Sequence, residues 1–109
     1  MGLDSQESSE HLRSIFKALG DPIRLRLFSL LTHEELCVCH LTESLKLPQS
    51  TVSRHLGVLR SAGLVSTRRE GKWMHYRLAE DVPKQLIEMA GPLADRPADG
   101  ERGECSSLA

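Results

Sequence analysis

Aromatic side chains are scarce in this chain of 109 residues, which has only Phe16, Phe28, Trp73 and Tyr76. A core must therefore be built from Leu, Ile and Val, and pairing of two copies would help so small a chain to bury enough apolar surface. No apolar run approaches the roughly 20 residues that span a bilayer, and residues 1–10 are polar and acidic, unlike a signal peptide. We therefore expect one soluble cytoplasmic domain, with no membrane partner and with reduced thiols.

The net charge of −1 conceals an uneven distribution along the chain. Residues 45–77 carry seven basic side chains against one acidic, whereas residues 1–44 carry four against seven and residues 78–109 carry three against seven. A basic segment between acidic ends is typical of a localised phosphate-binding surface. Taken alone, the charge pattern fits an ordinary solvated face somewhat better.

Apolar spacing predicts the secondary structure. Helices are expected over residues 12–19, 22–31, 37–45, 49–62 and 82–90, and strands over residues 64–68 and 73–78. Asp21 is the expected N-cap of the second helix, and Glu70-Gly71 the expected tight turn between the strands. Two short helices with a Pro-containing link, followed by a two-stranded ribbon, make a winged helix-turn-helix, a mainly α (α+β) fold of order α-α-α-α-β-β-α. Residues 1–94 form this domain, and residues 95–109 are expected to be a flexible tail.

The helix over residues 49–62 is the expected DNA-reading element, because the second helix of such a pair lies in the major groove. Gln pairs with adenine, Arg with guanine, and Ser or Thr with bases or phosphates. His55 is expected either to reach a phosphate or to pack against the preceding helix. The candidate DNA contacts in this helix are Gln49, Ser50, Thr51, Ser53, Arg54 and His55.

Three basic residues, Arg68, Arg69 and Lys72, flank the predicted hairpin turn. A wing contacts the DNA backbone at this place, so they are candidate phosphate contacts. Trp73 is interpreted as a core anchor for the wing rather than as a base-stacking residue.

Cys37 and Cys39 lie one residue apart at the start of the third predicted helix, and Cys105 is the only other cysteine. A Cys-x-Cys pair suits thiophilic ions such as As(III), Sb(III), Cd(II) or Pb(II). Two buried small hydrophobic residues are an equally good interpretation of the spacing. The position beside a predicted DNA-reading helix favours a sensor.

Four motifs together resemble the ArsR/SmtB repressors, and the resemblance covers about residues 10–90. They fall in the family's order and spacing at residues 18–26 (ALGDPIRLR), 35–39 (ELCVC), 50–56 (STVSRHL) and 71–78 (GKWMHYRL). The resemblance is closest to the arsenical-responsive branch. It implies a homodimer, paired through its first and last helices, that represses a resistance operon. The partner is then double-stranded operator DNA with an imperfect palindrome.

The same resemblance implies a repressor without a cofactor in its apo state, released from DNA when As(III), Sb(III) or an organoarsenical binds Cys37 and Cys39. It implies no enzymatic activity. A thiol enzyme such as an arsenate reductase needs an anion cradle beside its nucleophile, and no glycine-rich phosphate loop accompanies these cysteines.

Two positions depart from the family pattern. Thr42 stands where arsenic repressors carry a third cysteine, and His40 stands where an aspartate commonly follows the second. Two thiolates are therefore expected unless Cys105 folds back as a third ligand, which a ~14-residue flexible segment with a reach of about 20 Å permits. No histidine follows His75, which excludes the family's zinc site on the last helix, and no cysteine precedes Cys37, unlike the cadmium/lead branch.

On an intact helix, residues i and i+2 point about 200° apart. Cys37 and Cys39 are therefore expected to share one ion only if the start of the third helix unwinds, which would disfavour the DNA-bound geometry of the helix packed on it. The alternative is a redox-sensing or Cd/Pb-sensing repressor of the same fold. A disulfide between Cys37 and Cys39 is expected to be strained, which leaves Cys105 as a further partner to consider.

Overall fold

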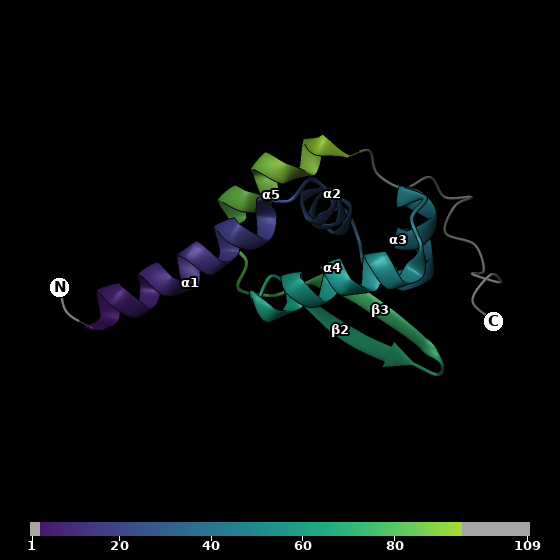
Figure 1. Cartoon of the computed structure of the whole chain (residues 1–109), viewed down its shortest axis with the longest axis horizontal. Coiled ribbons are helices and arrows are strands. Elements are labelled where there is room, and N and C mark those ends of the chain that lie inside the picture. The colour runs from purple at the N-terminus through teal and green to yellow at the C-terminus, as the bar shows by residue number, and fades with distance from the viewer. Residues whose placement is uncertain (1–2, 95–109) are drawn as a thin grey trace.

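The computed structural model describes the backbone of residues 3–94 and the side chains of residues 9–94. The predicted winged helix-turn-helix is confirmed, with one short strand and one 3₁₀ turn added (Figure 1). The elements are α1 (Leu3–Leu19), α2 (Pro22–Leu31), β1 (Leu36–Cys37), α3 (Val38–Leu45), α4 (Gln49–Ser61), β2 (Val65–Glu70), β3 (Trp73–Leu78), α5 (Lys84–Ala90) and η1 (Gly91–Leu93).

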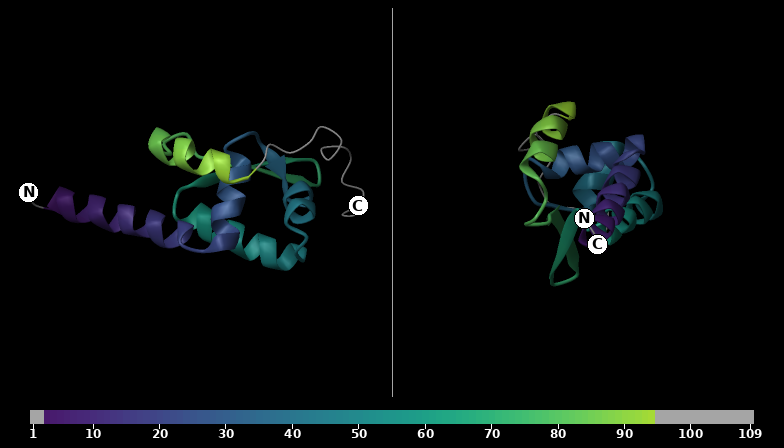
Figure 2. Two further views of the ribbon diagram at one scale, coloured as in Figure 1. Left: turned by 90° about the horizontal axis from the view of Figure 1, so that it is seen from above. Right: turned by 90° about the vertical axis from the view of Figure 1, so that its left-hand side faces the viewer.

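Most boundaries lie close to the predicted ones, and two differ for a physical reason. Helix α1 begins at Leu3, although its first turns carry no apolar stripe that would reveal a helix. Figures 1 and 2 show this end of α1 projecting from the body of the molecule. Helix α5 begins at Lys84, so Val82 precedes it and packs on the core from the connecting segment. The predicted tail, residues 95–109, lies outside the described residues.

Asp21 caps α2 as the sequence predicts. Its carboxylate accepts hydrogen bonds from the backbone N–H groups of Ile23 (2.9 Å) and Arg24 (3.2 Å). These bonds, the one from Arg24 foremost, lower the pKa of Asp21 from its ordinary value. The cap fixes where α2 begins and therefore how it presents its buried face.

Aliphatic side chains from α2, α3 and α4 fill the core, as the scarcity of aromatic residues predicts. Burying each such leucine stabilises the fold by roughly 1.5–3 kcal/mol. Because α4 contributes its whole inner face to this core, its outer face is held in a fixed orientation. The fully buried side chains of these three helices include Leu27, Leu41, Val52, Leu56 and Leu59, together with the aromatic Phe28.

The sheet has three antiparallel strands in the order β1-β3-β2, whereas the sequence predicts only the β2–β3 hairpin. Strand β1 pairs Leu36 with Tyr76 and Cys37 with His75. A two-residue strand is too short to show alternating hydrophobicity, which explains why the sequence pattern misses it. The hairpin turn is formed by the two residues after Glu70, where Gly71 supplies a φ of +63°.

Helix α5 and η1 are fastened to α2 by polar side chains. The buried Ser29 hydroxyl donates a hydrogen bond to the carbonyl oxygen of Ala90 (2.6 Å). Nε2 of His33 lies 3.0 Å from the carbonyl oxygens of both Gly91 and Ala94. These bonds hold the last helix on the side of the molecule that is remote from the hairpin (Figure 1).

Replacing Asp21 with Ala is expected to lower the stability of the fold, whereas Asp21→Asn keeps an acceptor for the two N–H groups and most of the stability. Because folding lowers this pKa, the contribution of Asp21 is complete above the ordinary aspartate value of about 3.9 and is lost as pH falls through the lower folded value. Urea unfolding of the three proteins, from about pH 7 down to about pH 3, measures this. If the difference in the free energy of unfolding between wild type and Asp21→Ala grew as the pH fell, this prediction would be contradicted.

Candidate functional site

Cys37 and Cys39 lie together at the junction of β1 and α3. Cys37 ends the strand and is the N-cap of the helix, with extended backbone angles (φ −82°, ψ 161°), and Cys39 lies in the first helical turn. Both residues are only 3% exposed, and the structure joins their sulfur atoms in a disulfide. An extended residue followed by a helix therefore brings two side chains together that a continuous helix would separate.

The premise behind the expectation that α3 must unwind before both sulfurs reach one ion is wrong. It assumed that Cys37 is helical, but the pairing of Cys37 with His75 holds this residue in a strand. A disulfide between Cys37 and Cys39 would be unfavourable if both residues were helical. Because Cys37 is extended, the structure contains this disulfide. An intact α3 therefore does not keep the two sulfur atoms apart.

His40 belongs to the same site, although the sequence marks it only as a departure from a family pattern. Its Nδ1 is 3.3 Å from Sγ of Cys37. One ligand atom from each of Cys37, Cys39 and His40 lies within 4.8 Å of the others. The spacing of Cys37 and His40, three residues apart at a helix start, was the signal that could have found it.

The two other positions considered for a third ligand have different outcomes. The hydroxyl of Thr42 donates a hydrogen bond to the backbone oxygen of Val38 (2.7 Å), so it is engaged within α3. Cys105 lies outside the described residues, and its role as a third ligand stays a prediction.

The cysteines are in contact with the wing. Trp73, the first residue of β3, is half-buried and packs against Cys37 and Cys39. The ammonium group of Lys72 lies 5.7 Å from the centre of the Trp73 ring. Trp73 anchors the wing as predicted, but it does so on the cysteine pair.

Arg68 reaches from the wing to the segment just before the cysteines. Its guanidinium donates two hydrogen bonds to the Glu35 carboxylate, at 2.7 and 3.3 Å, and lies 3.6 Å from the Glu70 carboxylate. The hydrogen bond from Arg68 is the main reason that the pKa of Glu35 is lowered. In this structure the guanidinium of Arg68 is thus paired with carboxylates, and its predicted phosphate contact stays a prediction.

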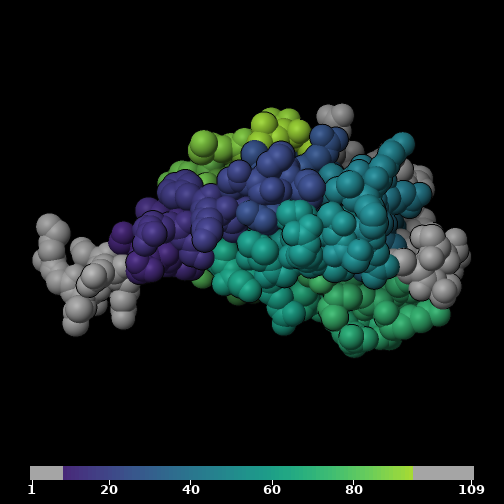
Figure 3. Space-filling view, in the orientation of Figure 1, coloured from purple at the N-terminus to yellow at the C-terminus, as the bar shows by residue number. Residues whose placement is uncertain are grey.

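The outer face of α4 presents the predicted reading residues. Gln49, Ser50 and Arg54 are exposed, and Thr51 and Ser53 are half-buried. Figures 1 and 3 show α4 and the hairpin at adjoining parts of one edge of the molecule. The DNA contacts of these five residues stay predictions.

His55 takes the other of its two predicted roles. It is 5% exposed, and its Nδ1 lies 3.2 Å from the guanidinium of Arg24 and 3.9 Å from the Asp21 carboxylate. The side chain therefore joins α4 to the start of α2. Its assignment as a DNA contact is corrected for this reason.

On the wing, Arg69 and Lys72 are exposed on either side of Gly71. The phosphate contacts predicted for these two side chains stay predictions.

Comparison with known proteins identifies the family. Residues 21–67 match the family described as "Bacterial regulatory protein, arsR family". A helix-turn-helix-type transcriptional regulator of Methanocaldococcus jannaschii is 42% identical over 88 residues, which cover 80% of this chain and 99% of the relative. The chain belongs to the ArsR family.

Other members of the ArsR family extend this comparison. The arsenical resistance operon repressor of Escherichia coli is 47% identical over 70 residues, 63% of this chain and 60% of the relative, so the chain spans about three-fifths of that repressor's length. Reduced HlyU from Vibrio cholerae is similar in structure, with a TM-score of 0.73, 33% identity and coverage of 85% of this chain and 98% of HlyU. A homodimeric winged helix-turn-helix domain of Mycobacterium bovis has a TM-score of 0.72 at 26% identity and covers 85% and 83%. The chain is thus a DNA-binding transcriptional regulator.

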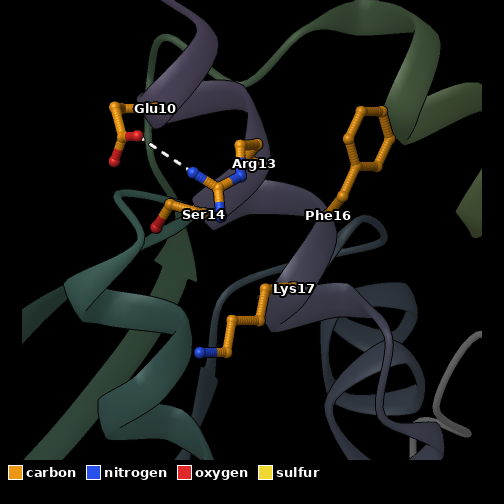
Figure 4. Close-up of a pocket in the computed structure, with 5 residues that line it drawn as sticks. All are labelled: Glu10, Arg13, Ser14, Phe16 and Lys17. Atoms are coloured by element: carbon orange, nitrogen blue, oxygen red, sulfur yellow. Dashed lines mark hydrogen bonds and ion pairs between the residues drawn. The ribbon is translucent and has the colours of Figure 1, made fainter. Parts of the chain in front are cut away.

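Apolar side chains stand exposed on the outer faces of α1, α5 and η1 of this ArsR-family chain. Figure 4 shows the hollow along α1, lined by the Glu10–Arg13 ion pair and by Phe16, which points away from that pair. Phe16 is 60% exposed and Met89 is 73% exposed, whereas Ile15 and Ala18 on α1 face the core. These outer faces are the ones predicted to meet a second copy. Among residues 3–94, no helix is long and apolar enough to cross a membrane.

Replacing Gln49 or Arg54 with Ala is expected to lower affinity for the specific site by about 1–3 kcal/mol each and to spare binding to random DNA. Replacing Arg69 or Lys72 with Ala is expected to weaken both kinds of binding alike and to reduce the salt dependence by about one counterion each. Fluorescence anisotropy at several salt concentrations measures both. Equal losses on specific and random DNA for Gln49→Ala and Arg54→Ala would contradict the assignment of base contacts.

Proposed function

We propose that the chain is a homodimeric, metalloid-responsive transcriptional repressor. In this proposal the apo dimer binds an imperfectly palindromic operator, and As(III), Sb(III) or an organoarsenical releases it by binding the thiolates of Cys37 and Cys39. The observation that carries the proposal is the placement of the two sulfur atoms side by side at the β1–α3 junction. The family membership and the arsenical repressor among the relatives support the choice of inducer.

The chemistry of the pair favours an arsenical. As(III) is thiophilic and binds thiolates, and a helix N-terminus favours the thiolate form. An arsenical with one carbon substituent leaves two positions for sulfur, which these two cysteines fill. Arsenite itself has a third position, and Thr42 offers no sulfur for it.

The site has three direct connections to the DNA-binding face. Strand β1, which ends at Cys37, is hydrogen-bonded to β3 of the wing. Glu35, two residues earlier, holds Arg68 of the wing. Helix α3, which begins after Cys37, packs on α4. A ligand that binds one arrangement of this junction more tightly than another shifts both the wing and the reading helix, and DNA binding shifts the site reciprocally.

A redox-sensing repressor is the second candidate, and the adjacency of the two sulfurs favours it. Oxidation of the two thiols forms the Cys37–Cys39 bond, releases two protons and passes two electrons to an oxidant such as a peroxide. The same junction would then change with oxidation state instead of with bound ligand.

Cys37→Ser and Cys39→Ser are each expected to repress normally but to lose release by arsenite and phenylarsenite, because a single thiolate holds As(III) weakly. Cys105→Ser is expected to spare release by phenylarsenite. The measurement is release of labelled operator DNA against inducer concentration for wild type and the three variants, under strongly reducing conditions. Normal arsenite release by both Cys37→Ser and Cys39→Ser would rule out this site. In a separate assay without reductant, release of wild type by peroxide, with no release by either arsenical, would establish the redox candidate instead.

The dimer is expected to form through the exposed apolar faces of α1 and α5. Phe16→Glu and Met89→Glu place a charge on these faces and should shift the protein toward monomer and lower operator affinity, since two reading helices address successive major grooves. Sedimentation velocity at micromolar concentration measures the assembly, and anisotropy measures the affinity. Unchanged dimers in both variants would show that another surface pairs the subunits.

A further inference from the structure

We propose that Cys37, Cys39 and His40 form a Cys₂His site for a thiophilic divalent cation, Zn(II) or Cd(II), in the reduced protein. This inference deepens the proposed function and rests on the same cysteine pair. It assigns a metal-ligand role to His40, beyond the two thiolates that the sequence already marks as ligands for thiophilic ions.

Geometry is the first support. A tetrahedral Zn(II) ion with Zn–S bonds of about 2.3 Å and Zn–N bonds of about 2.0–2.1 Å holds its ligand atoms roughly 3.5–3.8 Å apart. In the structure, Nδ1 of His40 is 3.3 Å from Sγ of Cys37. Ligand atoms from Cys37, Cys39 and His40 all lie within 4.8 Å of one another. Reduction of the sulfur–sulfur bond and small side-chain rotations therefore suffice to surround one ion.

Donor chemistry is the second support. Imidazole is a good ligand for Zn(II), whereas As(III) prefers sulfur. His40, next to Cys39, thus provides the imidazole that a divalent cation binds. Thr42 has no thiol, so it cannot provide the third sulfur that arsenite would bind. Three protein ligands with a fourth position open to solvent are a stable arrangement for Zn(II), and His40 is only half-buried, which leaves the site open on its side.

Charge is the third support. Cys37 and Cys39 are 3% exposed and packed under Trp73, so an uncompensated charge at the site would be costly. Two thiolates neutralise one divalent cation, and a neutral imidazole adds a bond without adding charge. The complex is therefore electrically neutral where it is buried.

The experiment uses the full, reduced chain under anaerobic conditions. Cd(II) and phenylarsenite are titrated separately into wild type, His40→Ala, His40→Gln and the control His11→Gln, which removes an exposed imidazole on α1. Thiolate-to-cadmium absorption and Trp73 fluorescence report binding. We expect both His40 variants to lose at least about tenfold in Cd(II) affinity, and His11→Gln to match wild type. Phenylarsenite, which needs only the two thiolates, should bind all four proteins equally.

X-ray absorption of the Zn(II)-loaded protein shows directly whether an imidazole binds the metal. A purely structural role of His40 would give no such signal. Wild type should show one imidazole beside two sulfur ligands, and His40→Ala should lose the imidazole signal. Unchanged Cd(II) affinity in both His40 variants, or a spectrum without imidazole in wild type, would overturn the inference.

Failure of this inference is distinguishable from failure of the proposed function. If phenylarsenite releases wild type from operator DNA but the His40 variants bind Cd(II) with unchanged affinity, only the Cys₂His site is refuted. If Cd(II) binding depends on His40 but no arsenical releases the operator, the metal site stands and the proposed inducer is wrong.

Discussion

The pairing of β1 with β3 is the constraint on which the cysteine site of this molecule depends. It involves two residues of β1, yet it holds Cys37 in an extended conformation directly before a helix. A helical Cys37 would turn its sulfur away from that of Cys39. Because the same pairing attaches the cysteine segment to the wing, it both assembles the site and links it to an element that is predicted to contact DNA.

Two arginines show how the basic charge of the chain is divided between structure and DNA binding. Arg68 is held by Glu35 and ties the wing to the cysteine segment. Arg24 donates to the carbonyl oxygen of Ala18 and lies against the buried His55, which ties the first two helices to α4. The predicted DNA-binding surface is centred on the start of α4 and the tip of the hairpin, where Arg54, Arg69 and Lys72 are exposed.

Much of the fold was predictable because its signals are local. The Asp-Pro start of α2, the apolar spacing of α4 and the glycine turn of the hairpin each act within a few residues, and the structure has all three. The roles of Arg68, His55 and His40 were not predictable in this way. Each depends on a partner or a backbone conformation fixed by another element.

The sequence by itself determined the winged helix-turn-helix and its family, because hydrophobic periodicity, helix caps and the order of motifs are local features of the chain. It also determined that two cysteines lie near the DNA-reading helix. Only the tertiary structure decided that these cysteines and His40 face one another, since a two-residue strand leaves no periodic signal and its conformation comes from the strand it pairs with. It also decided which basic side chains are committed to carboxylates, because ion pairs between distant segments form only after the core has placed those segments together.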